Sequence, residues 1–146
     1  MTTTLIIKQI VKCFKNGGKI LICGNGGSMA MASHMAAELV GIYGNSKALP
    51  AIALTDTSVI TAIANDLGYK EVFARQVEAL GKKGDILIVF TTSGTSNNII
   101  EVMYQAKLRG IDVIDMPRIK GTTQEIQENQ LHLTHLICKQ VKEYFK

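Results

Sequence analysis

Two polar loops are the first segments of this sequence whose residue types suit chemistry. Residues 24–28 read Gly-Asn-Gly-Gly-Ser and follow the apolar run 19–23, and residues 91–96 read Thr-Thr-Ser-Gly-Thr-Ser and follow the apolar run 85–90. Glycines let backbone amides approach a ligand closely, and the amino end of a helix favours an anion. The first loop therefore indicates a ligand site. The hydroxyl groups of the second favour a phosphate ester.

Neither loop matches a nucleotide-binding motif. The glycines of 24–28 do not have the GxGxxG spacing, and no acidic residue follows a second strand at the ribose position, so dinucleotide binding is not indicated. Residues 91–96 lack the lysine of a P-loop, so hydrolysis of a nucleoside triphosphate is not indicated either. A plain tight turn remains the alternative for the first loop, and a helix cap for the second.

A histidine and a glutamate follow the first loop at helical spacing. His34 and Glu38 are four residues apart, which places both side chains on one face of a helix. Such a pair suits a metal ion or acid–base catalysis, whereas a surface hydrogen bond is the ordinary alternative. The rest of this helix is rich in Ala, Met and Leu, and these two residues are its only ionisable groups. That isolation favours a functional pair. Gln127, His132 and His135, further along the chain, read by themselves as a polar helix face.

The elements that must position these residues alternate between strands and helices. Apolar runs predict strands over 19–23, 51–54, 85–90 and 111–114. Helical periodicity predicts helices over 4–15, 28–42 with Ser28 as N-cap, 58–64, 70–80, 97–109 and 122–145. This alternation predicts an α/β fold: a three-layer sandwich with a parallel sheet flanked by helices, of flavodoxin or Rossmann type. Ligands of such sheets bind at the carboxyl ends of the strands, where both polar loops lie.

Composition bounds the class of protein. A chain of 146 residues with 47% hydrophobic and 19% charged residues predicts one globular domain, 1–146, and excludes a disordered or coiled-coil protein. The net charge of +4 is spread along the chain, which argues against nucleic-acid binding. Three cysteines without CxxC spacing predict a reduced, cytoplasmic protein. No apolar run is long enough for a membrane span or a signal peptide.

Together these segments resemble the sugar isomerase (SIS) domain family, and within it the phosphoheptose isomerases. The resemblance covers nearly the whole chain and rests on GGKILICGNGGS, HMAAELVG, AIALTDTSVITAIANDLGY, FARQVEAL, KKGDILIVFTTSGTSNNIIE and the pair Gln127 and His135. It implies conversion of sedoheptulose 7-phosphate to D-glycero-D-manno-heptose 7-phosphate. It also implies a cytoplasmic homotetramer that begins the synthesis of nucleotide-activated heptose, for lipopolysaccharide or for capsule.

The resemblance further implies a role for each site residue. The substrate-binding positions are Asn25, Gly26, Gly27, Ser28, Glu38, Asn65, Asp66, Thr91, Thr92, Ser93, Ser96 and Gln127. The zinc-binding positions are His34, Glu38, Gln127 and His135, and Glu38 and His135 are also the catalytic base and acid. Moving a carbonyl between two carbons needs a base to transfer a proton, and a second group for the proton on oxygen.

The spacing of two of these residues predicts a site shared between subunits. Gln127 and His135 are eight residues apart, about 12 Å of rise on one helix, so one straight helix would not bring both to one ion. Either two subunits supply them, or one of them serves only in acid–base chemistry. Apolar residues on more than one side of this helix favour an interface, with the core of a monomer as the alternative: Leu131, Leu133, Leu136, Ile137 and Val141.

The chain departs from the family at three places. It lacks a further N-terminal helix, and it has Ile42 where the family often has arginine. Between Ile114 and Gly121 it lacks a turn, a helix and a strand, through a true deletion or an incomplete sequence. The second is favoured, because the loss would expose sheet and core. Two other functions fit the SIS domain: a non-catalytic protein that associates with the replication initiator DnaA, and a sugar-phosphate sensor.

Overall fold

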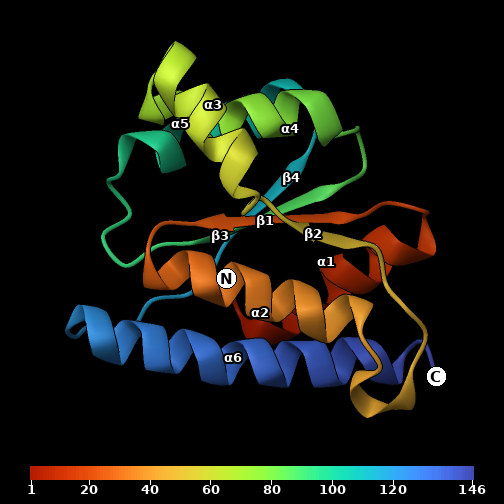
Figure 1. Ribbon diagram of the computed structural model, residues 1–146. Helices are drawn as coiled ribbons and strands as arrows, with labels where there is room; N and C mark the ends of the chain where they lie inside the picture. The colour runs from red at the N-terminus through yellow and green to blue at the C-terminus, as the bar shows by residue number, and fades with distance from the viewer.

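Three helices cover each face of a four-stranded parallel sheet in the computed structural model (Figure 1). The structure describes residues 1–146 apart from the side chain of Asn45. The strands lie in the order β2-β1-β3-β4, and their bounds are Ile20–Gly24 (β1), Ala51–Ala53 (β2), Ile86–Phe90 (β3) and Asp112–Asp115 (β4). The three-layer α/β sandwich expected from the sequence is confirmed.

The helices divide into two layers, each with its own core cluster. One layer consists of α1 (Thr3–Lys15), α2 (Gly27–Val40) and α6 (Thr123–Glu143), and the other of α3 (Thr57–Leu67), α4 (Ala74–Leu80) and α5 (Asn97–Leu108). Two short 3-10 turns, η1 (Tyr43–Asn45) and η2 (Tyr69–Glu71), complete the chain. No helix among the described residues is long and apolar enough to cross a membrane.

Parallel pairing sets the two polar loops side by side. Every residue of β1 and β3 is buried, as expected for central strands covered on both faces. Their register pairs Gly24 with Phe90, the last residues of the two strands. The segments 24–28 and 91–96 therefore leave the sheet at neighbouring points of its carboxyl edge.

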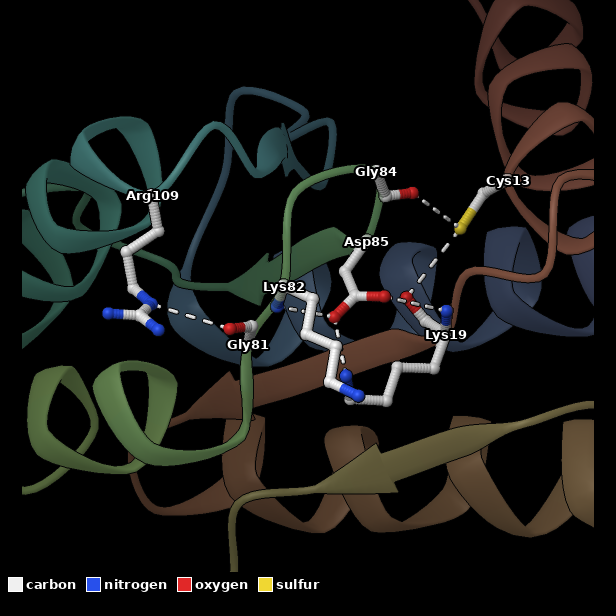
Figure 2. A network of polar contacts seen from close by, with 7 residues as sticks. All are labelled: Cys13, Lys19, Gly81, Lys82, Gly84, Asp85 and Arg109. Carbon is white, nitrogen blue, oxygen red and sulfur yellow. Dashed lines mark hydrogen bonds and ion pairs between the residues drawn. The ribbon is translucent and has the colours of Figure 1, made fainter.

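A buried carboxylate ties the opposite, amino-terminal edge of the same two strands together (Figure 2). Asp85 is 4% exposed and accepts hydrogen bonds from the backbone amides of Lys19, at 3.0 Å, and Lys82, at 2.8 Å, and from the Lys19 ammonium. The Cys13 thiol donates to the carbonyls of Gly84 and Lys19 beside it. Burial of Asp85 opposes its charged form, but these donors outweigh burial and lower the pKa of its carboxyl group.

Two predicted boundaries near the site are wrong. Gly26, with a φ of +56°, is the N-cap of α2, so the predicted cap Ser28 instead lies inside the helix and is buried. Helix α3 continues to Leu67 and ends at Gly68, whose φ is +96°. Asn65 and Asp66 therefore lie in the last helical turn, beyond the predicted helix end at residue 64. Asn and Asp are common in turns but can also adopt helical geometry, so their presence alone does not show where a helix ends.

The connection from β4 to α6 is short. It runs through residues 116–122, and Met116 is fully buried in the cluster beneath α2 and α6. Thr122 begins α6 with a capping box, in which its hydroxyl accepts from the Glu125 amide and the Glu125 carboxylate accepts from the Thr122 amide. In this chain β4 is thus an edge strand of the sheet. Between Asp115, the last residue of β4, and Gly121 the described residues form no helix or strand, and the sequence already lacks the family's turn, helix and strand there.

Candidate active site

Helices α2 and α6 run in the same direction and hold three of the predicted residues together. The Nε2 atoms of His34 on α2 and His135 on α6 lie 2.9 Å apart. Glu38, one turn beyond His34, places its Oε1 atom 3.4 Å from the same His34 nitrogen. One ligand atom from each side chain lies within 4.8 Å of the others. Residues 101 positions apart in the sequence thus form one cluster.

The donor set of this cluster fits a divalent metal ion. The second carboxylate oxygen of Glu38 is buried and has no hydrogen-bond partner among the described residues, which is costly unless another ligand satisfies it. Two imidazoles and a carboxylate are a usual zinc donor set, with bonds of about 2.0–2.2 Å. Nitrogen atoms that face each other at 2.9 Å need to separate by only a few tenths of an ångström to share an ion of that size.

Gln127 lies beside the glycine loop and not in the cluster. A Cβ atom added to Gly27 would lie 2.6 Å from Nε2 of Gln127, so the amide covers this glycine. Because α6 is one continuous helix, Gln127 and His135 are separated by about 12 Å of rise along it. The structure therefore brings Gln127 to the first loop within one chain. Its predicted role as a metal ligand stays a prediction.

The two polar loops enclose a small cavity of about 50 Å³. Its lining consists of an asparagine, a phenylalanine and hydroxyl residues from both loops: Asn25, Ser28, Phe90, Thr91, Thr92, Ser93 and Ser96. None of these lining residues is charged. The second loop bends inward at its glycine, because the Gly94 amide donates to the Thr91 hydroxyl at 3.0 Å and Gly94 has a φ of +71°. Hydroxyl groups beside the start of α5 suit an oxyanion.

Asn25 is fixed by two residues that sequence reasoning did not assign to the site. Its side-chain amide pairs reciprocally with that of Asn98, at 2.9 and 2.8 Å, and the Tyr69 hydroxyl donates to its oxygen at 3.0 Å. Asn98 is buried and lies in the first turn of α5. Its position directly behind the hydroxyl loop was a usable signal. Nothing in the sequence indicated Tyr69.

The remaining predicted residues lie apart from the cluster. Asn65 and Asp66 are exposed on α3, where the Asn65 amide donates to Asp66 at 2.9 Å.

Cys138 is buried in α6, and burial, reinforced by the charge of Glu38, raises the pKa of its thiol to about 12. A thiol with so high a pKa stays protonated near neutral pH.

A larger cavity, of about 430 Å³, lies elsewhere, between α3 and α4. Its lining is mostly apolar and includes Val59, Ile63 and Leu80. It contains none of the predicted site residues. The predicted site residues that come together therefore lie at the smaller polar cavity and the neighbouring α2–α6 surface.

Residues 5–116 match the family model for the SIS domain. The chain belongs to the SIS-domain family. A phosphoheptose isomerase of Campylobacter concisus is 43% identical to it over 160 residues, covering 97% of this chain and 85% of the relative. Among solved structures, a phosphoheptose isomerase from Neisseria gonorrhoeae superposes with a TM-score of 0.90 at 39% identity, and one from Francisella tularensis with 0.92 at 35%. Each covers 97% of this chain and 85% of the other chain.

The comparisons also bear on the length of this SIS domain. The alignment with the Campylobacter relative extends over 160 positions, more than the 146 residues of this chain. That relative therefore contains residues within the aligned region that this SIS domain does not have. This agrees with a missing segment, whose placement between Ile114 and Gly121 stays a prediction.

Proposed function

We propose that this protein converts sedoheptulose 7-phosphate to D-glycero-D-manno-heptose 7-phosphate. The observation that carries the proposal is the convergence of His34, Glu38 and His135 beside a hydroxyl-lined cavity. Relatives that resemble the chain over almost its whole length are phosphoheptose isomerases, and this supports the same reaction class here: an aldose–ketose isomerase.

The cluster supplies the two proton-transfer groups that such a reaction needs. Glu38 takes a proton from C1 of the ketose and returns it to C2, through an enediolate. No described residue donates a hydrogen bond to its buried second oxygen, so no such bond stabilises the carboxylate against taking up a proton. His135 exchanges a proton with the substrate oxygens, a task suited to imidazole near neutral pH. The hydroxyl loop binds the phosphate, and this remote binding holds the reacting carbons in place.

A divalent ion, proposed to be zinc, fits the same side chains. His34, Glu38 and His135 would hold it, with Gln127 as the further ligand implied by the resemblance. When bound, such an ion polarises a carbonyl and stabilises negative charge that develops on its oxygen. The proton transfers themselves remain with Glu38 and His135.

Conservative substitutions in the cluster test the proposal. Glu38→Gln keeps the shape and removes the base, so kcat should fall by at least about 10²-fold while substrate still binds. His135→Asn should behave alike. Glu128→Gln and His132→Asn are matched controls, because both residues are exposed on α6 and lie outside the cluster. Normal turnover in Glu38→Gln would refute the mechanism and favour a binding protein or a sensor.

Metal dependence is tested separately. Dialysis of wild-type protein against a chelator should abolish turnover of sedoheptulose 7-phosphate, and added zinc should restore it. Metal analysis of the His34→Ala variant should show less zinc than wild type. Equal zinc content in the two proteins would exclude this cluster as the metal site.

The assembly and location proposed for this protein are a homotetramer in the cytoplasm. The support is the resemblance, together with three buried, free cysteines. The apolar surface of α6 supports an interface less than the sequence indicated. Ile137 and Val141 are buried in this chain's own core, and Leu131 and Leu133 pack against it, which leaves Leu136 at 36% exposure. Which subunit supplies Gln127 to a given site is tested below.

A further inference from the structure

Arg118 contacts the hydroxyl loop from the short connection that follows β4. Because β3 and β4 are parallel and pair Val89 with Asp115, this connection leaves the sheet beside residues 91–96. The buried amide of Gln130 on α6 joins the two segments. Its Nε2 atom donates to the carbonyl of Thr91 at 3.3 Å and lies within 3.5 Å of the Met116 and Pro117 carbonyls. The residue before Arg118 is therefore held against the start of the loop.

The Arg118 guanidinium lies over the glycine of that loop. A Cβ atom added to Gly94 would lie 3.3 Å from Nη2 of Arg118 and 3.5 Å from its Cζ. The other terminal nitrogen, Nη1, donates to Asp115 at 2.7 Å. One side of the guanidinium is thus held by a carboxylate, while Nη2 faces the loop. The side chain is 31% exposed, so solvent and ligand can reach it.

The contact with Arg118 is significant because the loop has no charge of its own. Residues 91–98 carry no charge, and neither does any residue that lines the 50 Å³ cavity. A phosphate monoester carries about −1.5 to −2 charges at neutral pH and binds most tightly where a cation accompanies the hydroxyl and amide donors. A guanidinium has five N–H donors, so it can contact a carboxylate and a phosphate at once.

We propose that Arg118 is a specificity-determining residue that supplies the positive charge of the phosphate site, with Asp115 as the residue that positions it. The inference rests on the proposed function, because it assumes that the substrate is a phosphate ester. It assigns to the β4–α6 connection a part in binding. Arg118 then discriminates the phosphorylated sugar from its neutral counterpart.

Kinetics of Arg118→Gln test the proposal. Loss of a charged contact of this kind raises KM for sedoheptulose 7-phosphate about tenfold and leaves kcat within about twofold, because the reacting carbons are not touched. Arg118→Lys keeps the charge but loses the planar set of guanidinium donors, so its affinity should lie between those of Arg118→Gln and wild type. The matched control is Arg75→Gln, since Arg75 also pairs with a carboxylate three residues away, at 3.0 Å, but on α4.

The salt dependence of binding and a double variant show whether Arg118 attracts the phosphate or only neutralises Asp115. Raising ionic strength from about 0.05 to 0.3 M should weaken wild-type binding more than that of Arg118→Gln, because salt screens the lost attraction. Asp115→Asn keeps a side-chain oxygen that can accept from Arg118 and removes the opposing charge, so it should hold the guanidinium in place and lower KM. Arg118→Gln combined with Asp115→Asn should keep a raised KM. A wild-type KM in the double variant would show that Arg118 merely neutralises Asp115, and would overturn the proposal.

Inorganic phosphate provides a readout that does not depend on turnover. It should raise the melting temperature of wild-type protein and of Arg75→Gln, but less that of Arg118→Gln. Wild-type-like KM and phosphate protection in Arg118→Gln, alongside a weakened Ser93→Ala/Ser96→Ala variant, would refute the role of Arg118. If wild-type protein does not turn over sedoheptulose 7-phosphate but phosphate still raises its melting temperature, the proposed function is refuted and the role of Arg118 in binding phosphate is not.

Discussion

Asn25 lies at the point where the glycine loop, α5 and η2 meet. Each of its partners contributes differently, which allows their effects to be separated. Tyr69→Phe removes one hydrogen bond to Asn25 and should cost about 0.5–1.5 kcal/mol of stability. Asn98→Asp sets a carboxylate oxygen against the oxygen of Asn25 in a buried place, and should cost more, about 1–3 kcal/mol, and raise KM as well.

Denaturant unfolding and steady-state kinetics measure these two effects. Tyr104→Phe is the control, because Tyr104 is exposed on α5 and is 57% accessible. If Tyr69→Phe and Tyr104→Phe have the same stability and KM, the hydrogen bond to Asn25 contributes nothing in solution.

The hydroxyl residues of the second loop give a further prediction at the residue scale. Replacing Ser93 and Ser96 together with alanine should weaken binding of the sugar phosphate, at about 1.5–3 kcal/mol for each lost hydrogen bond to a charged group. The fold should be retained, because the side chains of both residues line the cavity and are not in the core. Calorimetric titration with the substrate measures the change. An unchanged affinity would show that this loop does not bind the phosphate.

At the scale of elements, the glycine that ends β1 and the glycine that begins α2 should respond differently to the same substitution. A Cβ atom at Gly24 would lie 2.7 Å from the backbone of Ser28 and 2.8 Å from the Phe90 carbonyl, so Gly24→Ala must move the sheet edge. At Gly27 the nearest atoms belong to the end of the flexible Gln127 side chain. Gly27→Ala should therefore keep the fold and displace Gln127.

Thermal melting and activity distinguish the two variants. Gly24→Ala should lower the melting temperature strongly, whereas Gly27→Ala should change it little and reduce turnover. A Gly27→Ala enzyme with full activity would show that Gln127 is not needed where the structure places it.

The edge opposite the site carries its own pH dependence. Asp85 has a lowered pKa in the folded protein, so its interactions stabilise the fold above the ordinary aspartate pKa of about 3.9. This stabilisation is lost as the pH falls through the lower, folded-state value. Asp85→Asn should reduce stability at neutral pH and flatten the loss of stability below about pH 4. Urea unfolding between pH 2 and 7 measures it, with the exposed Glu78→Gln as control.

Most elements could be predicted from the sequence, because central strands such as β1 and β3 are continuous apolar runs bounded by glycine. The same patterns located both polar loops and the His34–Glu38 pair. What the sequence did not reveal depends on which helices pack together. The separation of Gln127 from His135, the contact of Tyr69 with Asn25 and the place of Arg118 arise from tertiary register, which no local pattern encodes.

The whole molecule raises the question of how many chains form one site. One chain supplies His34, Glu38 and His135 together. If Gln127 of a neighbouring subunit completes the site, inactive Gln127→Ala and inactive Glu38→Gln proteins should recover activity when mixed and allowed to exchange subunits. If subunits exchange and no activity returns, each site is built from one chain, and Gln127 acts at the glycine loop beside it.

The parallel course of α2 and α6 has a consequence for which sugars can react. Ser28 lines the 50 Å³ polar cavity and His34 belongs to the cluster, and the two residues are six positions apart on α2, which is about 9 Å of rise along the helix. The helix therefore fixes the distance between the proposed phosphate site and the proposed catalytic cluster. If the cavity holds the phosphate as proposed, we expect an extended sugar phosphate to react faster than a three-carbon one, because the reacting carbons must lie at some distance from the phosphate.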